Sequence, residues 1–249
     1  MKNSVVTEYA DVIKNMLNAI ASIGIQAEVK DGDVYTATSK DLRINQMLER
    51  DGSKFLSRMY YNYIIYGRAL AYKAKTIRAC LAEYDGNPIY EYWDGAVTGV
   101  HVIDSNLWNI DENIDTGELY GVYIGSKGSS SVNEMRNYLK RREFIYSTDW
   151  APMGKQTHSI GWFIKNTDEP VSALLGIDND LITNPEGQSV ERRNALIKRA
   201  MQDTIIPAAS KFVMNMQNDI GLQNDMRLVL KTGDTDTWIS AWNKEEPIW

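Results

Sequence analysis

The sequence predicts an α+β protein with N-terminal helices, a central antiparallel or mixed β-sheet, and long C-terminal helices. Three observations predict this fold. Apolar residues recur at helical spacing up to residue 67, alternate as in strands from 69 to 146, and return to helical spacing after residue 171. Helices and strands are therefore segregated along the chain, which is typical of the α+β class.

The N-terminal part predicts a long amphipathic helix followed by a strand. Residues 5–23 carry apolar side chains at helical spacing, with Ser4 as the expected N-cap and Gly24 as the expected stop. Residues 25–29 alternate as in a strand, and a turn is expected at 31–32.

Two further helices are expected before the central sheet. A short one covers residues 42–48. A stronger one is capped by Ser53, covers 55–66 and ends at Gly67. Its aromatic residues are more typical of a core than of a ligand site.

The central part predicts strands joined by polar turns. Residues 69–74 and 89–93 are expected to be strands around a turn at 85–88. Further strands are expected at 97–103, 107–110, 119–124 and 143–146. The second and third of these should form a hairpin, because a polar turn separates them. Residues 125–131 predict a flexible loop, and 132–142 a short basic helix.

The last third predicts helices again. Residues 171–175 should form a helix that stops at Gly176, and a polar loop is expected at 178–188. The next helix begins at Ser189 or Val190 and continues towards Thr204.

Proline then interrupts the helical pattern. Pro207 should restart or kink the helix, and residues 208–220 are strongly amphipathic before Gly221. Residues 226–230 predict one more strand.

Composition limits the kind of partner. The chain has 249 residues and a net charge of −6. A protein that grips DNA by its phosphates normally carries excess Lys and Arg on the contact face. Tight general binding to nucleic acid is therefore not expected. A surface that lets DNA slide past is compatible with this charge, because an acidic wall lowers adhesion.

No catalytic or metal-binding pattern is found in the sequence. There is one cysteine, Cys80, and the two histidines, His101 and His158, lie far apart. These residues offer neither zinc-ligand spacing nor a Cys-His or Ser-His-Asp nucleophile. The run 125–131 lacks the order of a phosphate-binding loop, and the acidic run 111–118 suits a hairpin turn better than a calcium loop. We therefore expect no enzyme activity, no cofactor and no metal.

The sequence also predicts where the chain is kept. Its first twenty residues contain no signal-peptide pattern, and no apolar run is long enough to span a membrane. We therefore expect assembly in a reducing cytoplasm and no contact with a membrane.

Four segments of the last third occur in an order that resembles a known family. They are Ser172–Ile182, Ser189–Ala195, Thr204–Phe212 and Asn215–Asn218. This order resembles the C-terminal core of the portal proteins of tailed bacteriophages. In that family a helix ends in a glycine-isoleucine turn, a loop follows, and a helix leads into a threonine-isoleucine-proline motif and a further long helix. Asp178 departs from the pattern, because proline is frequent at that place.

The earlier chain is similar to the wing of the same family. There a helix reaches a Tyr-Gly-Asn-Ala type junction and continues as a strand, and Tyr66-Gly67-Arg68-Ala69 matches it except that Arg68 replaces asparagine. Residues 102–108 with their hairpin are similar to the sheet that follows.

The resemblance implies three regions. Residues 1–150 would be a wing-like α+β domain, 151–188 a shortened stem and tunnel-loop region, and 189–249 a helical region on the crown side. The family places two stem helices and a clip domain before the glycine-isoleucine turn. Only residues 155–170 occupy that place, and at about 1.5 Å per residue they are too short for these elements.

The resemblance also implies a function and partners. The chain would form a homo-oligomeric ring of about twelve copies, a dodecamer, by heterologous contacts at the portal vertex of the capsid. Double-stranded DNA would pass through it during packaging and ejection. The implied partners in the virion are the major capsid protein, the terminase motor and the head-tail adaptor protein. The alternative is another phage head or neck protein, structural or interacting, without a DNA channel.

Candidate site residues follow from this resemblance. The loop 178–189 would be the tunnel loop facing the channel. Residues proposed to face DNA from this loop and the next helix are Asn184, Glu186, Gln188, Ser189, Arg192, Arg193, Lys198 and Arg199. The basic ones would bind phosphate or form salt bridges between subunits, or else simply lie on a solvated helix face. Trp238 and Trp242, one helical turn apart, would serve subunit contacts or else cover the local core.

Overall fold

The structure is a computed structural model of the 249-residue chain. It describes residues 9–37, 42–75, 82–84, 87–89, 97–124, 138–148, 160–222, 224–231 and 233–247. Within these ranges the protein is α+β, as the sequence predicts, with three three-stranded antiparallel sheets and one two-stranded hairpin.

The first described helix ends two residues before its predicted end at residue 23. Helix α2 covers Ala10–Ala21, and the Ser22 hydroxyl at its C-terminus donates a hydrogen bond to the Ala19 carbonyl at 2.6 Å. Gly24 does not stop this helix as predicted, because it already pairs with Lys231 as the first residue of strand β1, Gly24–Asp31. The expected N-cap, Ser4, lies outside the described residues.

Strand β1 turns as predicted. The turn contains Gly32 at φ 63°, a conformation that glycine adopts without steric cost, and β2, Val34–Ala37, pairs back on β1.

One helix stands where two were predicted. Helix α3 runs from Leu42 to Tyr66, so the prediction that Ser53 caps a second helix is wrong. Gly52 lies inside the helix and is buried. A Cβ added at this position would lie in ordinary van der Waals contact, 3.8 Å from the Ile25 side chain of β1. The packing of α3 on β1 therefore outweighs the weak helix propensity of glycine. Gly67, at φ 71°, ends the helix as predicted.

The central sheet has β3, Arg68–Lys75, as its middle strand. It pairs with β6, Val97–Ile103, on one side and with β10, Phe144–Thr148, on the other. The strand expected at 69–74 is confirmed, and of the strand expected at 89–93 only Ile89 is among the described residues. The turn belongs to a separate hairpin of β4, Ala82–Tyr84, and β5, Asn87–Ile89.

The third sheet contains the predicted hairpin. Strand β7, Trp108–Glu112, pairs with β8, Leu119–Ile124, and β8 pairs with β9, Tyr138–Lys140. The prediction of a helix over 132–142 is wrong for its described part, which is β9 followed by the 3-10 turn η2, Arg141–Glu143. The reason is tertiary, because Leu139 pairs with Val122 and packs on the small core around Trp108. The loop predicted at 125–131 lies outside the described residues.

The C-terminal part is helical around one strand. Its elements are α4 Ile160–Asn166, α5 Val171–Leu175, α6 Asp180–Thr183, α7 Val190–Ala200, the π-helical turn η3 Met201–Ile205, α8 Ile206–Ile220, β11 Met226–Lys231 and α9 Thr235–Trp242. The predicted stops at Gly176 and Gly221 are confirmed, with φ 64° and 73°. The prediction that a helix restarts at Pro207 is confirmed, because the π-helical turn η3 ends at Ile205 and α8 begins at Ile206 with Pro207 in its first turn. Proline is tolerated there, because an N–H in the first turn of a helix has no partner within the helix.

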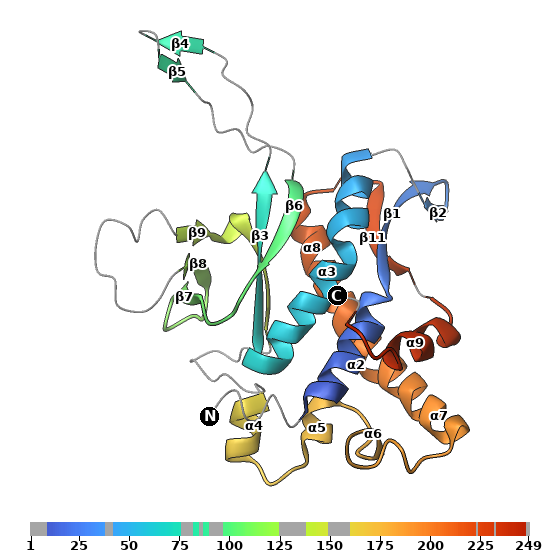
Figure 1. The fold of residues 1–249 in the computed structure, drawn as a ribbon. Helices are drawn as coiled ribbons and strands as arrows, with labels where there is room; N and C mark the ends of the chain where they lie inside the picture. Colours follow the sequence, from blue (N-terminus) through green and yellow to red (C-terminus); the bar gives the residue numbers. More distant parts are fainter. Residues whose placement is uncertain are drawn as a thin grey trace.

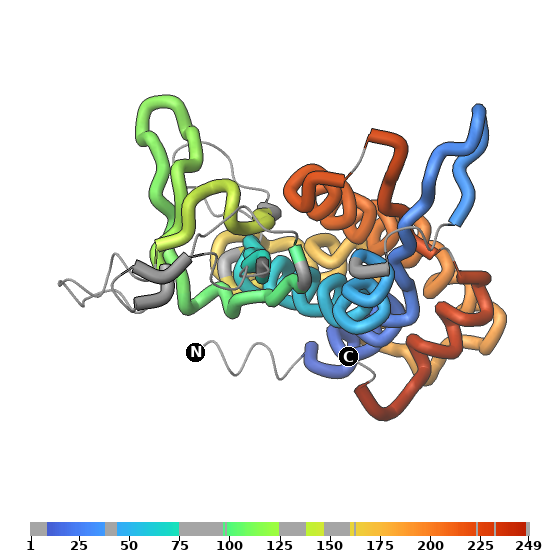
Figure 2. Tube along the Cα trace, turned by 90° about the horizontal axis from the view of Figure 1, so that it is seen from above, coloured from blue at the N-terminus to red at the C-terminus, as the bar shows by residue number. Residues whose placement is uncertain are grey.

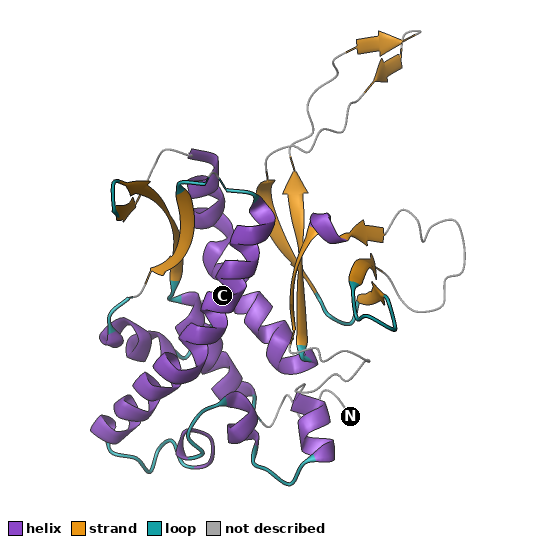
Figure 3. Cartoon of the chain, turned by 180° about the vertical axis from the view of Figure 1, so that it is seen from behind, coloured by secondary structure: helices purple, strands orange, loops and turns teal. Residues whose placement is uncertain are grey.

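Two sheets enclose the central helices. Strand β11 pairs antiparallel with β1, so one sheet joins both ends of the chain in the order β11-β1-β2. Helices α3 and α8 lie between this sheet and the sheet β10-β3-β6 (Figure 1; Figure 3 gives the reverse view). Seen from above in Figure 2, the β7–β8 hairpin and helix α9 lie at opposite ends of the molecule.

The core crosses the three predicted regions. The larger hydrophobic cluster contains buried residues from all parts of the described chain, the first being Val12 and the last Trp242. The buried residues of the smaller cluster are Leu70, Trp108, Val122 and Phe144. Among the helices of the described ranges, none is long and apolar enough to cross a membrane.

Candidate functional site

The predicted tunnel loop has internal structure. Helix α6 occupies its first half, so the expectation of a purely polar loop over 178–188 is wrong. The Asp178 carboxylate accepts the Asp180 N–H at 3.0 Å and thereby starts this turn of helix. In the second half, the Asn184 side chain accepts the Gly187 N–H at 3.1 Å, and the Gln188 amide donates to the Asn184 carbonyl at 3.4 Å. Asn184 and Glu186 remain exposed.

The loop ends at a capped helix, as predicted. Ser189 is the N-cap of α7, and its hydroxyl accepts the Arg192 N–H at 3.2 Å. The same arginine ties the loop to the helix, because its guanidinium donates to the Asp180 carboxylate at 2.9 Å. Asp180 lies twelve residues earlier in the chain, so spacing in the sequence did not reveal this ion pair.

The basic residues of α7 differ from one another in their surroundings. Arg192 is paired with Asp180, and Arg199 with Asp203 at 3.4 Å. Arg193 is half-buried, and its Nε has no hydrogen-bond partner in the described structure. Lys198 is exposed and has no ion-pair partner among the described residues. The structure thus does not gather the four cations into one free phosphate site.

The charge of the whole segment is nearly balanced. Residues 178–203 contain five carboxylates and four cations, which gives a net charge of −1. Such a surface attracts DNA phosphates weakly, because affinity for the DNA backbone depends on excess Lys and Arg.

A contact between two distant turns holds the segment in place. The Thr204 hydroxyl donates a hydrogen bond to the Gly176 carbonyl at 2.6 Å. Thr204 lies in η3, where the long helix widens, and Gly176 lies at the left-handed end of α5. An added Cβ at Gly176 would approach the Thr204 hydroxyl to 2.6 Å, so the close approach also requires glycine. Both segments stand out in the sequence, but no local pattern there predicts that they touch.

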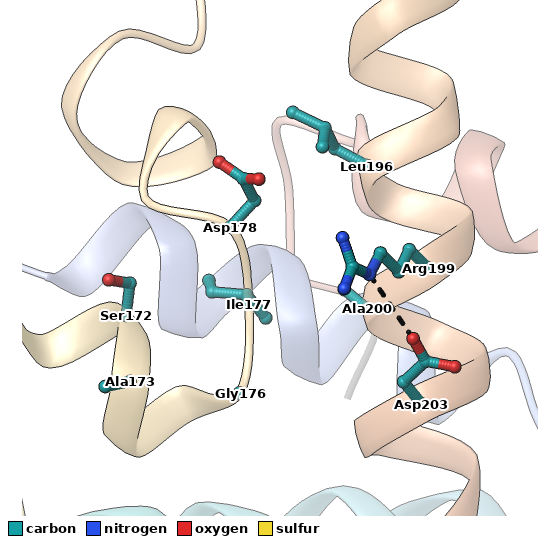
Figure 4. A pocket seen from close by; sticks show the side chains of 9 residues that line it. All are labelled: Ser172, Ala173, Gly176, Ile177, Asp178, Leu196, Arg199, Ala200 and Asp203. Atoms are coloured by element: carbon teal, nitrogen blue, oxygen red, sulfur yellow. Dashed lines mark ion pairs between the residues drawn. The ribbon is translucent and has the colours of Figure 1, made fainter.

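Two cavities flank this contact. The first, of about 350 Å³, lies between the turn after α5 and helix α7 (Figure 4). The second, of about 470 Å³, lies between α3, α5 and η3. The first is lined by Ser172, Ala173, Gly176, Ile177, Asp178, Leu196, Arg199, Ala200 and Asp203. Tyr60 lines the second, and complete burial raises the pKa of its hydroxyl.

The two candidate subunit-contact residues are buried. Trp238 and Trp242 are only 6% and 4% exposed and belong to the main core cluster. This burial agrees with the alternative that they cover the local core, and it leaves little of either side chain for a neighbouring subunit.

The remaining candidate chemistry is sparse. His101 lies exposed on β6, and His158 lies outside the described residues. The acidic run 111–118 covers the end of β7 and the β7–β8 turn. Among the described residues, no group of three or more His, Cys, Asp or Glu side chains is arranged to hold a metal ion.

No protein-family model matches the chain, and no curated protein matches it.

Proposed function

We propose that the chain is a ring-forming portal subunit of a tailed bacteriophage, which lines the DNA channel at the capsid vertex during genome packaging and ejection. The observation that carries this proposal is the hydrogen bond from Thr204 to Gly176. The two residues belong to the two turns whose order resembles the portal core, 28 residues apart in the chain. Their contact joins the loop 178–189 and the helical run 190–220 into one structural unit.

The shape of this unit supports a channel subunit. The helical run from Val190 to Ile220 would be about 45 Å long at about 1.5 Å per residue, and the loop 178–189 lies at its N-terminal end (Figure 1). A loop held at the end of a rigid helix suits contact with a moving polymer. Its near-neutral charge suits DNA that has to slide without being held.

The proposal includes the partners of such a ring. They are further copies of the chain, double-stranded DNA in the channel, the major capsid protein, the terminase motor and the head-tail adaptor protein. The function is mechanical and electrostatic, so no catalytic group and no cofactor belong to it.

A second candidate is favoured by one observation. Between β10 and Gly176 the described helices are only α4 and α5, of seven and five residues. These are too short to be stem helices, which favours a head or neck protein without a channel as the alternative.

Two measurements test the proposal. Native mass spectrometry and negative-stain microscopy of the purified protein should show rings with a central channel, and a folded protein that stays monomeric or dimeric would contradict a portal.

Heads assembled with a Gly-Ser replacement of residues 184–188 should contain normal rings but less packaged DNA. A Gly-Ser replacement of residues 113–117, in the β7–β8 turn, is the matched control. Unchanged packaging in the first variant would remove the loop from the proposal.

A further inference from the structure

The two cavities beside the Thr204–Gly176 contact form one groove. Both are lined by Ala173 and Asp203, so they adjoin along the face between α5 and the long helix. We call them together the acidic groove. Its volume of several hundred Å³ is enough for the side chains of a short peptide segment.

Carboxylates outnumber cations along the acidic groove. Asp178 and Asp203 line the first cavity, and Asp203 and Glu169 line the second. Arg199 is the one cation among the described residues that line either cavity. The lining therefore has a net charge of −2.

The carboxylates are available to a partner. Asp178 faces Leu196 and Arg199 across the first cavity (Figure 4), and none of the described residues forms an ion pair with it. Its carboxylate accepts the Asp180 N–H at 3.0 Å. Asp203 pairs with Arg199, but the side chains are 65% and 75% exposed, and such a pair contributes little in water. A second cation can therefore bind without breaking a strong interaction.

The second cavity has aromatic and aliphatic walls. Tyr60, Tyr63, Phe163 and Leu174 line it, and the two tyrosine rings stack at 6.3 Å between centroids. A lysine or arginine side chain combines an apolar stem with a cationic head, so it suits a site with apolar walls and carboxylates at the rim.

We propose that the acidic groove receives the basic segment Lys140–Arg142 of a second copy of the chain. This inference rests on the proposed function, because it names the contact that joins neighbouring subunits. The segment has three consecutive cations, and Lys140 and Arg142 are exposed. Arg141 is engaged with Asp219 at 3.5 Å and holds the segment against α8.

The placement of the two surfaces fits a ring. The segment lies at the end of β9 and the start of η2, beside the β7–β8 hairpin. Helix α7, whose residues line the first cavity, lies at the other side of the molecule (Figure 1). In a head-to-tail ring each contact joins two different faces of the subunit, so complementary surfaces have to lie apart on one chain. DNA is a poor occupant of the acidic groove, because phosphates and carboxylates repel each other.

The test is a charge swap. The groove variant carries Glu169→Lys and Asp178→Lys, the segment variant carries Lys140→Glu and Arg142→Glu, and the swap variant carries all four changes. Lys54→Glu with Arg58→Glu, two exposed cations of α3, is the matched control. Sedimentation velocity gives the concentration at which half of the protein is assembled, and circular dichroism confirms folding of each variant.

We expect the groove and segment variants to assemble less well, and the combination of their changes to restore assembly. The groove and segment variants should each need about tenfold more protein for half-assembly, because rim charges of opposite sign steer and register the contact. Mixing these two variants, or making the swap variant, should restore assembly, and the α3 control should assemble as the unchanged protein does.

The other outcomes separate the two proposals. If the unchanged protein forms rings and the groove or segment variant forms them equally well, the groove contact is wrong and the portal proposal stands. If both variants fail and the swap variant does not recover, Lys140–Arg142 is not the occupant. If the unchanged protein never assembles, both proposals fail together.

Discussion

The Thr204 hydroxyl lies 2.6 Å from the Gly176 carbonyl oxygen and joins the π-helical turn of the long helix to the end of α5. The hydrogen bond fixes where the loop 178–189 leaves α5 relative to the helix to which it returns. It also lies between the two adjoining cavities of the acidic groove, since Gly176 lines one and Thr204 the other.

Thr204→Val should therefore destabilise the protein by about 1 kcal/mol, the net contribution of a typical hydrogen bond. Gly176→Ala should cost more, because φ is 64° there and the new Cβ would crowd the Thr204 side chain. Urea unfolding measures both changes. Thr36→Val, on the exposed strand β2, is the control and should leave the free energy of unfolding almost unchanged. An equal change in the free energy of unfolding for Thr36→Val and Thr204→Val would show that the hydrogen bond from Thr204 to Gly176 does not stabilise the protein.

Arg68 should be hard to replace. Its guanidinium stacks on the buried Trp108 ring at 4.0 Å and donates to the carbonyls of Ser105 and Trp108 at 2.7 and 2.9 Å. Burial lowers the pKa of this guanidinium, which still remains a cation at neutral pH.

Arg68→Lys should cost about 2 kcal/mol, because a lysine cannot both stack flat on the indole and reach two carbonyls. The measurement is the free energy of unfolding by denaturant titration. Arg58→Lys, at an exposed position of α3, serves as control. A stability loss no larger than that of the control would show that the stacking and the two hydrogen bonds contribute nothing.

Asn18 should anchor the segment after α9. Its side chain is fully buried and donates to the carbonyls of Lys244 and Glu246 at 3.3 and 3.2 Å. Asn18→Ala should destabilise the protein by about 1–2 kcal/mol and loosen this segment first. Limited proteolysis followed by mass spectrometry should show faster cleavage after residue 242, whereas Asn218→Ala, at an exposed site, should not. Unchanged cleavage in Asn18→Ala would refute the anchor.

Acid should weaken the contacts of Asp51, which pairs with Arg50 in α3 and accepts a hydrogen bond from the Val100 backbone of β6. The Arg50 side chain donates to the Asp51 carboxylate at 2.8 and 2.7 Å and is the main cause that lowers the pKa of Asp51 below its usual value. A carboxyl with a lowered folded-state pKa stabilises the protein above its unfolded-state pKa of about 3.9, and this stabilisation is lost as the pH falls through the folded-state value.

The urea midpoint should accordingly fall between about pH 5 and pH 3, and it should fall less in Asp51→Asn. Asp33→Asn, at an exposed position of the β1–β2 turn, is the control. An identical pH profile for Asp51→Asn and the unchanged protein would contradict a contribution from this carboxyl.

Local signals in the sequence determined the class of the protein and the ends of many elements. Glycines at positive φ ended α3, α5 and α8 where the pattern predicted, and Ser189 capped α7. These features depend on a few neighbouring residues, because a left-handed glycine or an N-cap hydroxyl acts within one turn of the chain.

Only the tertiary structure decided what these elements pair with. Gly52 stayed helical because α3 packs on β1, Leu139 became a strand residue because β8 offered it a partner, and β1 paired with a strand about two hundred residues away. The same holds for the candidate site, where Asp180 pairs with Arg192 and Thr204 bonds Gly176. Such contacts gain their free energy from groups brought together by the whole fold, so no local pattern encodes them.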